Sequence, residues 1–139
     1  MRTFITRSLL VAVSMTLVGA CGDDKKVLKK ADFIKQADAI CLAASAESDK
    51  LGSPTSEKEL LALVPKLADI QLKSLAKIKA LGEPDTEAAK VNKLLADITK
   101  VFTTLRASTS MKEFQKSAAS VDGLNKVATD YGFKECGSG

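Results

Sequence analysis

Apolar residues recur every three or four positions through most of the chain beyond residue 30, which is the spacing of one face of an α-helix. Four such segments follow one another, the first over about residues 31–50. The clearest stripe belongs to the third segment and comprises Val91, Leu94, Leu95, Ile98, Val101, Phe102 and Leu105. Because no stretch of useful length alternates apolar and polar residues, the pattern predicts an all-α fold.

Turn and capping residues separate the four segments. The Gly-Ser-Pro-Thr run at 52–55 breaks the first helix, and Ser56 with Glu59 forms a capping box for the second. Ser110 and Glu113 repeat this pattern before the fourth helix. Short connections between amphipathic helices favour an up-down-up-down four-helix bundle.

The connection between the second and third helices contains several residues that typically end one helix or begin the next. Gly82 is expected to end the second helix, and Pro84 suits the first turn of the third. Glu83, Asp85 and Glu87 would then lie where negative charge is favourable, at the positive end of the third helix. Binding of a cation by these three carboxylates is the alternative.

Three residues mark irregular positions inside or at the end of helices. Pro65 lies within the second helix, so we expect either a kink or a short first turn with a restart near the proline. Gly123 lies within the fourth helix, where it costs about 1 kcal/mol relative to alanine, and we interpret it as allowing a close helix contact. Gly132 is expected to end the fourth helix.

The N-terminus has the organisation of a bacterial lipoprotein signal peptide, here residues 1–20. Arg2 and Arg7 precede an apolar run at 8–18, which is too short to span a bilayer of about 30 Å as a helix. Small residues then precede Cys21. We expect cleavage before Cys21 and lipidation of its thiol, with two or three acyl chains giving stable anchoring. The alternative is an ordinary signal peptide in which this cysteine is incidental.

Residues 21–30 are interpreted as a lipidated, charged tether that leads into a helical bundle domain at 31–139. Its basic cluster comprises Lys25, Lys26, Lys29 and Lys30. This cluster would attract anionic headgroups or, as we favour, is simply solvated. The formal net charge is +4, and two of these charges belong to arginines of the leader. So small an excess of positive charge, with few aromatic residues, gives no support for nucleic-acid binding.

Cys41 and Cys136 remain once Cys21 is lipidated. An even pair of cysteines in an exported protein indicates one disulfide. A metal site is the weaker alternative, because the chain has no His and the two thiols are distant in sequence. The disulfide requires residues 132–136, which reach at most about 17 Å when extended, to fold back along the first helix.

Two short segments carry a resemblance. They are Ala-Asp-Ala-Ile-Cys at 37–41 and Tyr-Gly-Phe-Lys-Glu-Cys-Gly at 131–137. In both, the chain resembles a group of small exported proteins and lipoproteins of actinobacterial type. The resemblance implies a helical bundle in which an early Cys is bonded to the Cys of a C-terminal Tyr-Gly-x-x-x-Cys-Gly. It implies no activity and no catalytic residues.

The sequence offers little catalytic chemistry. It contains no His, no Cys-x-x-Cys-His haem motif, no phosphate-binding Gly-rich loop and no Gly-x-Ser-x-Gly elbow. Ser74 with Lys73 or Lys77 could form a Ser-Lys dyad, but such a match is expected by chance at this composition. We therefore expect neither an enzyme nor a cofactor or metal site, and a His-free hydrolase is the remote alternative.

Gln71 and Asn125 fall on the apolar faces of the second and fourth helices. Each lies about 15 residues into its helix, so at a rise of about 1.5 Å per residue the two should meet in one core layer, near Ala37 and Val91. We favour a hydrogen-bonded pair that fixes helix register. The alternative is the polar end of a ligand pocket, in a small-molecule or lipid carrier with a cavity near these two residues and Tyr131.

Together these features favour a lipid-anchored, non-enzymatic protein of the cell envelope that acts as a binding or interaction module. It would be exported and held through Cys21 at the outer face of the cytoplasmic membrane, or at the outer membrane of a cell that has one. The loops at 52–56 and 106–110 would point away from the bilayer. On orientation alone, they are the expected surface for a protein partner.

Overall fold

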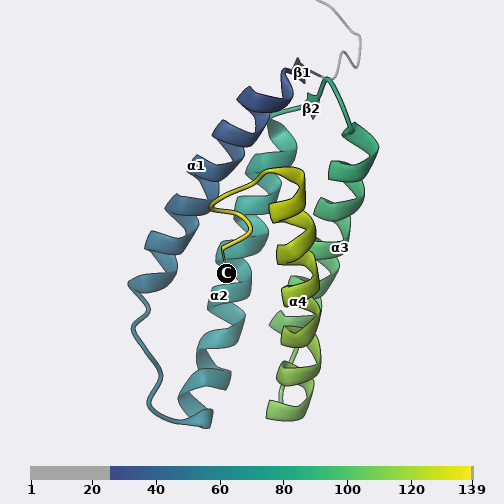
Figure 1. The fold of residues 1–139 in the computed structure, drawn as a ribbon. Helices are drawn as coiled ribbons and strands as arrows, with labels where there is room; N and C mark the ends of the chain where they lie inside the picture. Colours follow the sequence, from purple (N-terminus) through teal and green to yellow (C-terminus); the bar gives the residue numbers. More distant parts are fainter. Residues whose placement is uncertain (1–25, 139) are drawn as a thin grey trace, which may run out of the picture.

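The computed structural model describes residues 26–138, which form four helices and two very short strands (Figure 1). In chain order these are β1 (Val27–Leu28), α1 (Lys30–Asp49), α2 (Glu57–Ala80), β2 (Glu83–Pro84), α3 (Ala88–Arg106) and α4 (Met111–Tyr131). The predicted all-α, four-helix fold is confirmed, and Figure 1 shows consecutive helices running in opposite directions. The predicted signal peptide, Cys21 and Lys25 lie outside the described residues.

The two ends of the bundle differ in what they hold. We call the end that carries β1 and β2 the proximal end, and the end formed by the connections at 50–56 and 107–110 the distal end (Figure 1). The main buried cluster occupies the proximal half and comprises Phe33, Ala37, Leu75, Ile78, Val91, Leu94, Leu95, Ala128, Tyr131 and Phe133. The best-packed apolar contacts therefore lie where α1 and α3 begin and where α2 and α4 end.

Ser56 and Ser110 begin α2 and α4 through the predicted capping boxes. Each serine hydroxyl accepts a hydrogen bond from the backbone N–H three residues later, at 3.2 Å from Glu59 and 3.3 Å from Glu113. Each glutamate carboxylate in turn accepts from the backbone N–H and the hydroxyl of the threonine before the serine. The threonine N–H, followed by its hydroxyl, lowers the pKa of both carboxyl groups. Two copies of one Thr-Ser-x-x-Glu cap thus hold the distal end.

The connection between α2 and α3 differs from the prediction. The predicted place of Pro84 in the first turn of α3 is wrong, because Pro84 is buried in β2, which pairs in parallel with β1 before α3 begins. The N–H groups on either side of the proline make the bonds. Glu83 donates to the Lys26 carbonyl at 2.8 Å, and Asp85 donates to the Leu28 carbonyl at 2.7 Å. Because proline has no N–H, its position between two donors costs the pairing nothing.

Gly82 makes this pairing sterically feasible. It ends α2, as predicted, with a φ of 105°. A Cβ atom on this residue would lie 1.9 Å from the carbonyl oxygen of Lys26. Only glycine adopts such a φ at no cost and leaves room for the approaching chain. The second half of the expected solvated tether, residues 26–28, is therefore fixed against the bundle.

The three predicted irregularities have different outcomes. α2 runs unbroken through Pro65, which excludes a restart at the proline. Gly123 has no atom within 4 Å of the place a Cβ would take, so the predicted close helix contact is wrong. Gly132 ends α4, as predicted, with a φ of 119°.

Residues 133–138, which we call the C-terminal segment, fold back along α1 as the disulfide requires. Cys41 and Cys136 are bonded, with Cα atoms 5.2 Å apart, so the predicted disulfide is confirmed. The Asp38 carboxylate accepts hydrogen bonds from three successive N–H groups, those of residues 134–136, at 3.0 to 3.2 Å. Figure 1 shows the segment, in yellow, lying between α1 and α4. A covalent bond and a charged acceptor therefore hold the chain end together in this seam.

Candidate functional site

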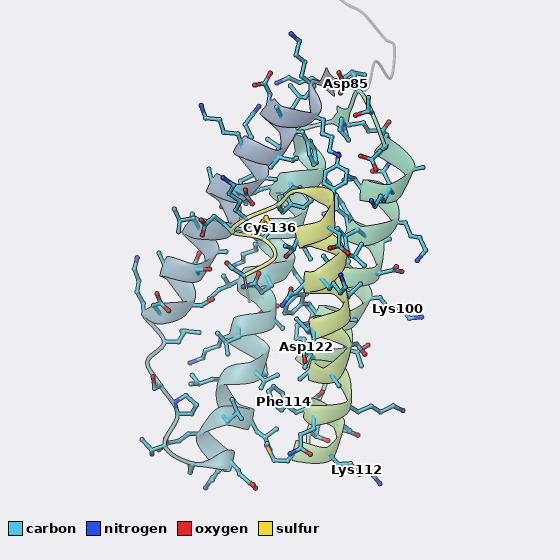
Figure 2. The ribbon with its side chains drawn as sticks, in the orientation of Figure 1. Asp85, Lys100, Lys112, Phe114, Asp122 and Cys136 are labelled. Atoms are coloured by element: carbon cyan, nitrogen blue, oxygen red, sulfur yellow. A yellow bond between two sulfur atoms is a disulfide. The ribbon has the colours of Figure 1, made fainter. Side chains whose placement is uncertain are left out.

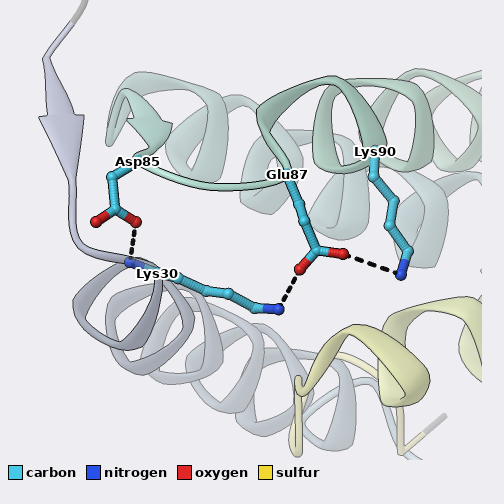
Figure 3. Close-up of polar contacts among 4 residues, drawn as sticks. All are labelled: Lys30, Asp85, Glu87 and Lys90. Carbon is cyan, nitrogen blue, oxygen red and sulfur yellow. Dashed lines mark hydrogen bonds and ion pairs between the residues drawn. The ribbon is translucent and has the colours of Figure 1, made fainter.

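The Asp85 carboxylate caps α1 across the fold. Its Oδ1 accepts a hydrogen bond from the backbone N–H of Lys30 at 2.9 Å (Figure 3). The predicted role of Asp85 at the start of α3 is therefore wrong. Strand pairing carries Asp85 to the first turn of α1, where N–H groups lack intrahelical acceptors and Lys29 at the N-cap supplies no side-chain bond.

Glu87 joins α1 to α3 at the proximal end. Its carboxylate forms an ion pair with Lys30 and a second one, at 3.4 Å, with Lys90 (Figure 3). The hydrogen bond from Lys30 is the main cause of its lowered pKa. Glu87 also has a left-handed φ of 58°, which turns the chain from the extended segment into α3. A residue other than glycine is strained by about 1 kcal/mol in this conformation. The two ion pairs help to keep Glu87 in it.

Tyr131 packs beneath these charges. The Lys30 ammonium lies 4.2 Å from the centre of its ring and the Lys90 ammonium 5.8 Å, both within the range of cation–π attraction. Burial, and then the negative charges of Glu87 and Asp85, raise the pKa of Tyr131. Its hydroxyl is buried without a hydrogen-bond partner among residues 26–138. A neutral phenol in this place supports packing at the proximal end.

The three acidic residues that follow α2 do not converge on one shared site. Glu83 accepts a hydrogen bond from the Asn92 side chain at 3.0 Å, whereas Asp85 and Glu87 bind Lys30. In the part of the chain that the structure describes, no group of three or more His, Cys, Asp or Glu residues is placed to hold a metal ion. The alternative of a cation bound by this trio therefore has no support.

A cavity of about 140 Å³, which we call the core cavity, lies between the four helices and the C-terminal segment. Gln71 and Asn125 both line it, so the sequence correctly placed the two amides in one layer. That layer includes Cys41 and Leu95 and lies about one turn from the predicted position, because Ala37 and Val91 are not in the lining.

The structure does not contain the favoured hydrogen-bonded pair. No hydrogen bond joins Gln71 to Asn125, and neither side-chain amide bonds another residue within 26–138. Both side chains are half-buried. Tyr131 does not line the core cavity, so the predicted grouping of all three residues is wrong.

Ser74 is a buried hydroxyl that no base approaches within the described chain. Its side chain is 5% exposed, and its Oγ has no hydrogen-bond partner among residues 26–138. Lys73 and Lys77 are exposed and share a shallow groove with it between α1 and α2. Without a hydrogen bond from hydroxyl to amine, this serine lacks the contact that activates a nucleophile.

An open groove of about 720 Å³, which we call the distal groove, lies between α3 and α4. It begins at the connection 107–110, one of the two loops that the sequence indicated as a partner surface. The other loop, at 52–56, does not contribute. The groove is lined by Asp97, Lys100, Val101, Thr104, Ala107, Ser108, Glu113, Lys116, Ser117, Ser120 and Leu124. Hydroxyl-bearing, apolar and charged side chains thus all contribute to the lining.

The two carboxylates and two ammonium groups that line the distal groove balance in formal charge but differ in their contacts. The Asp97 carboxylate is paired with Lys93, and the Glu113 carboxylate is used by the cap of α4. Lys100 and Lys116 form neither an ion pair nor a side-chain hydrogen bond with another residue of 26–138. Figure 2 shows Lys100 extending outward from α3. Of the four charged side chains in the lining, the two lysines are therefore the ones without a partner. Sequence reasoning missed this groove, because charge pairing depends on the fold.

Comparisons with known proteins return no relative. A scan against protein-family models finds no matching family, and searches of curated proteins and of solved structures find no match. The resemblance to exported actinobacterial bundles therefore stays a prediction. Among the described residues, no helix is long and apolar enough to cross a membrane.

Proposed function

We propose that this protein is a lipid-anchored, non-enzymatic interaction module of the cell envelope, which binds an acidic segment of another envelope protein in the distal groove. The observation that carries the proposal is the pair of unpaired lysines, Lys100 and Lys116, in an open groove that is partly lined by apolar side chains. An extended acidic segment would place carboxylates against the lysines and apolar side chains on Val101 and Leu124. Charge complementarity of this kind speeds encounter and sets register.

The position of the groove suits a protein held by Cys21. Residue 26 lies in the proximal end, and at about 3.5 Å per residue an anchor at Cys21 is no more than about 17 Å away. α3 has 19 residues and is therefore about 28 Å long. An anchor at Cys21 would therefore leave the distal groove at the end of the bundle remote from the lipid, where a partner in the envelope would have access.

The size of the core cavity favours this proposal over a carrier of lipids. Pockets for drug-sized ligands measure about 300 to 1,000 Å³. The core cavity, at about 140 Å³, is too small for an acyl chain. The proposal therefore treats lipid as an anchor of this protein rather than as its cargo.

The anchor is tested by growing cells with a radiolabelled fatty acid. The wild-type protein should carry the label and sediment with membranes. Cys21→Ala should lose both properties, whereas Cys41→Ala with Cys136→Ala should keep the label. Label on the Cys21→Ala protein, or none on the wild type, would refute the lipid anchor and leave the binding groove to be judged by its own experiment.

The groove is tested by photo-crosslinking in intact envelopes. A photoreactive amino acid is placed at Ser120, which lines the groove, or at its exposed neighbour Ala119, which does not. Position 120 should yield one discrete protein adduct and position 119 none. The adduct should disappear in the Lys100→Glu/Lys116→Glu variant.

The control for this charge reversal is Lys58→Glu with Lys66→Glu, which makes the same change on α2 at exposed positions outside the groove. It should retain the adduct. A peptide derived from the captured protein should contain an acidic stretch and bind less tightly at higher salt. Equal adducts at positions 119 and 120, or equal loss in both charge-reversal variants, would contradict the proposal.

A further inference from the structure

We infer that the core cavity is a binding site for a small, mostly apolar ring that carries one hydrogen-bonding group, a molecule of the size and chemistry of a phenol. This site is distinct in chemistry from the distal groove, although Val101 and Leu124 contribute to the walls of both. The inference does not depend on the proposed partner.

The volume selects the size of the ligand. An engineered protein cavity of about 150 Å³ lined by aliphatic and phenylalanine side chains takes up benzene. The core cavity measures about 140 Å³, so it matches a single six-membered ring with one small substituent. Acyl chains, peptides and nucleotides need several times this space.

The walls select a ring that is mainly apolar. Leu75 and Ile78 of α2, Leu94 and Ile98 of α3, and Leu124 of α4 face the cavity. These side chains belong to the buried core or pack against it. Transfer of an apolar ring from water into such surroundings is favourable, and no charged side chain of the four helices lines the cavity to oppose it.

The two amides select one polar group on that ring. Gln71 and Asn125 both line the cavity, and neither side chain has a hydrogen-bond partner within residues 26–138. The polar atoms of these amides are not fully buried, so water solvates them when no ligand is bound. A ligand that displaces this water must supply a hydrogen bond in its place. A single hydroxyl can donate to the oxygen of one amide and accept from the nitrogen of the other.

A route to the cavity is present on one side. Ser45 of α1 and Glu135 and Ser138 of the C-terminal segment line the cavity and are also exposed. Access therefore lies between α1 and the C-terminal segment. Cys41 and Cys136 are in the same wall, so the disulfide holds the entrance together.

The test uses the exported chain with Cys21→Ser, which removes the lipid and leaves the described residues unchanged. Phenol and benzene are the probes. Binding is followed by NMR from the side-chain NH₂ signals of Gln71 and Asn125 in the wild type, and from the methyl signals of Leu75 and Leu94, which also line the cavity, in every variant. Phenol should shift both sets of signals in a saturable manner. In the Gln71→Leu/Asn125→Leu variant, phenol should bind roughly tenfold more weakly, as expected for two lost hydrogen bonds. Benzene should bind this variant at least as tightly as before.

Filling and control variants make the result specific. Val121→Phe, or Ile98→Phe if the first does not fold, should abolish binding of both probes by occupying the cavity. Gln115→Leu makes the same amide-to-leucine change at an exposed position of α4 outside the lining and should bind phenol normally. Absence of saturable shifts, or shifts that persist in the filled variant, would overturn the site. Unchanged phenol affinity in the double leucine variant would overturn the role of the amides and the polar ligand class.

Discussion

Replacing Gly82 with alanine should destabilise the protein by about 3 kcal/mol, because the new Cβ displaces the chain that leads into α1. This atom would lie 1.9 Å from the carbonyl oxygen of Lys26, which belongs to backbone and cannot rotate away. Moving residues 26–28 aside breaks the hydrogen bonds that Glu83 and Asp85 donate, worth about 1 kcal/mol each. The φ of 105° adds a further 1–2 kcal/mol or so for alanine, partly offset by its smaller loss of backbone entropy.

Gly52→Ala is the matched control. Gly52 also has a positive φ, of 78°, but no atom lies within 4 Å of the position that its Cβ would take. This variant therefore has the conformational strain without the collision. It should cost about 1 kcal/mol or less.

Urea unfolding of the two variants and the wild type measures both costs. The midpoint should fall clearly for Gly82→Ala and little for Gly52→Ala, with the slope unchanged. Hydrogen exchange adds a local measurement, because the amides of Glu83 and Asp85 should lose protection only in Gly82→Ala. Equal destabilisation by the two substitutions, or retained protection at both amides, would refute the argument from close approach.

Three further changes test other parts of the fold. Gly123→Ala should raise the free energy of unfolding by about 0.5–1 kcal/mol, since the residue is helical, exposed and free of neighbours, and a lower melting temperature would contradict this. Folding lowers the pKa of Glu59 and Glu113 below 4.5, so their caps stabilise the protein above that pH and lose this contribution as the pH falls. In urea titrations, Glu59→Gln with Glu113→Gln should therefore lose less stability than the wild type as the pH falls from about 5 to 3. An equal loss in the variant and the wild type would argue against this role of the caps. Cys41→Ser with Cys136→Ser should lower the unfolding free energy by about 3–5 kcal/mol, and an unchanged urea midpoint would show that the bond adds nothing to the fold.

Local patterns were sufficient to predict the four helices and the distal caps. The stripe that begins at Val91 and the Ser-x-x-Glu boxes at Ser56 and Ser110 depend on residues within a few turns of each other. Counting helical rise from those caps also placed Gln71 and Asn125 in one layer. Such inferences succeed because helix period and capping act over a few residues.

Contacts between distant segments explain the errors. Pro84 satisfies every local rule for the first turn of a helix, yet β1, more than fifty residues earlier, keeps it extended. Asp85 caps α1 rather than α3 for the same reason. The amides of Gln71 and Asn125 share a layer without bonding, because the C-terminal segment and four helices together determine how much space remains between them. None of these outcomes could be predicted from a single short segment, because each depends on contacts between residues far apart in the sequence.

The Cys41–Cys136 bond also limits how far this protein can be stretched. A pulling force applied between residues 26 and 138 passes from α1 through the disulfide into residues 136–138, and residues 42–135, between the two cysteines, carry no tension. Within residues 26–138, only the segments 26–41 and 136–138 can extend, which amounts to roughly 60 Å at about 3.5 Å per residue. A chain tethered at one end and loaded at the other would therefore yield by peeling away β1 and the first turns of α1, while α2, α3 and α4 stay folded around their shared core.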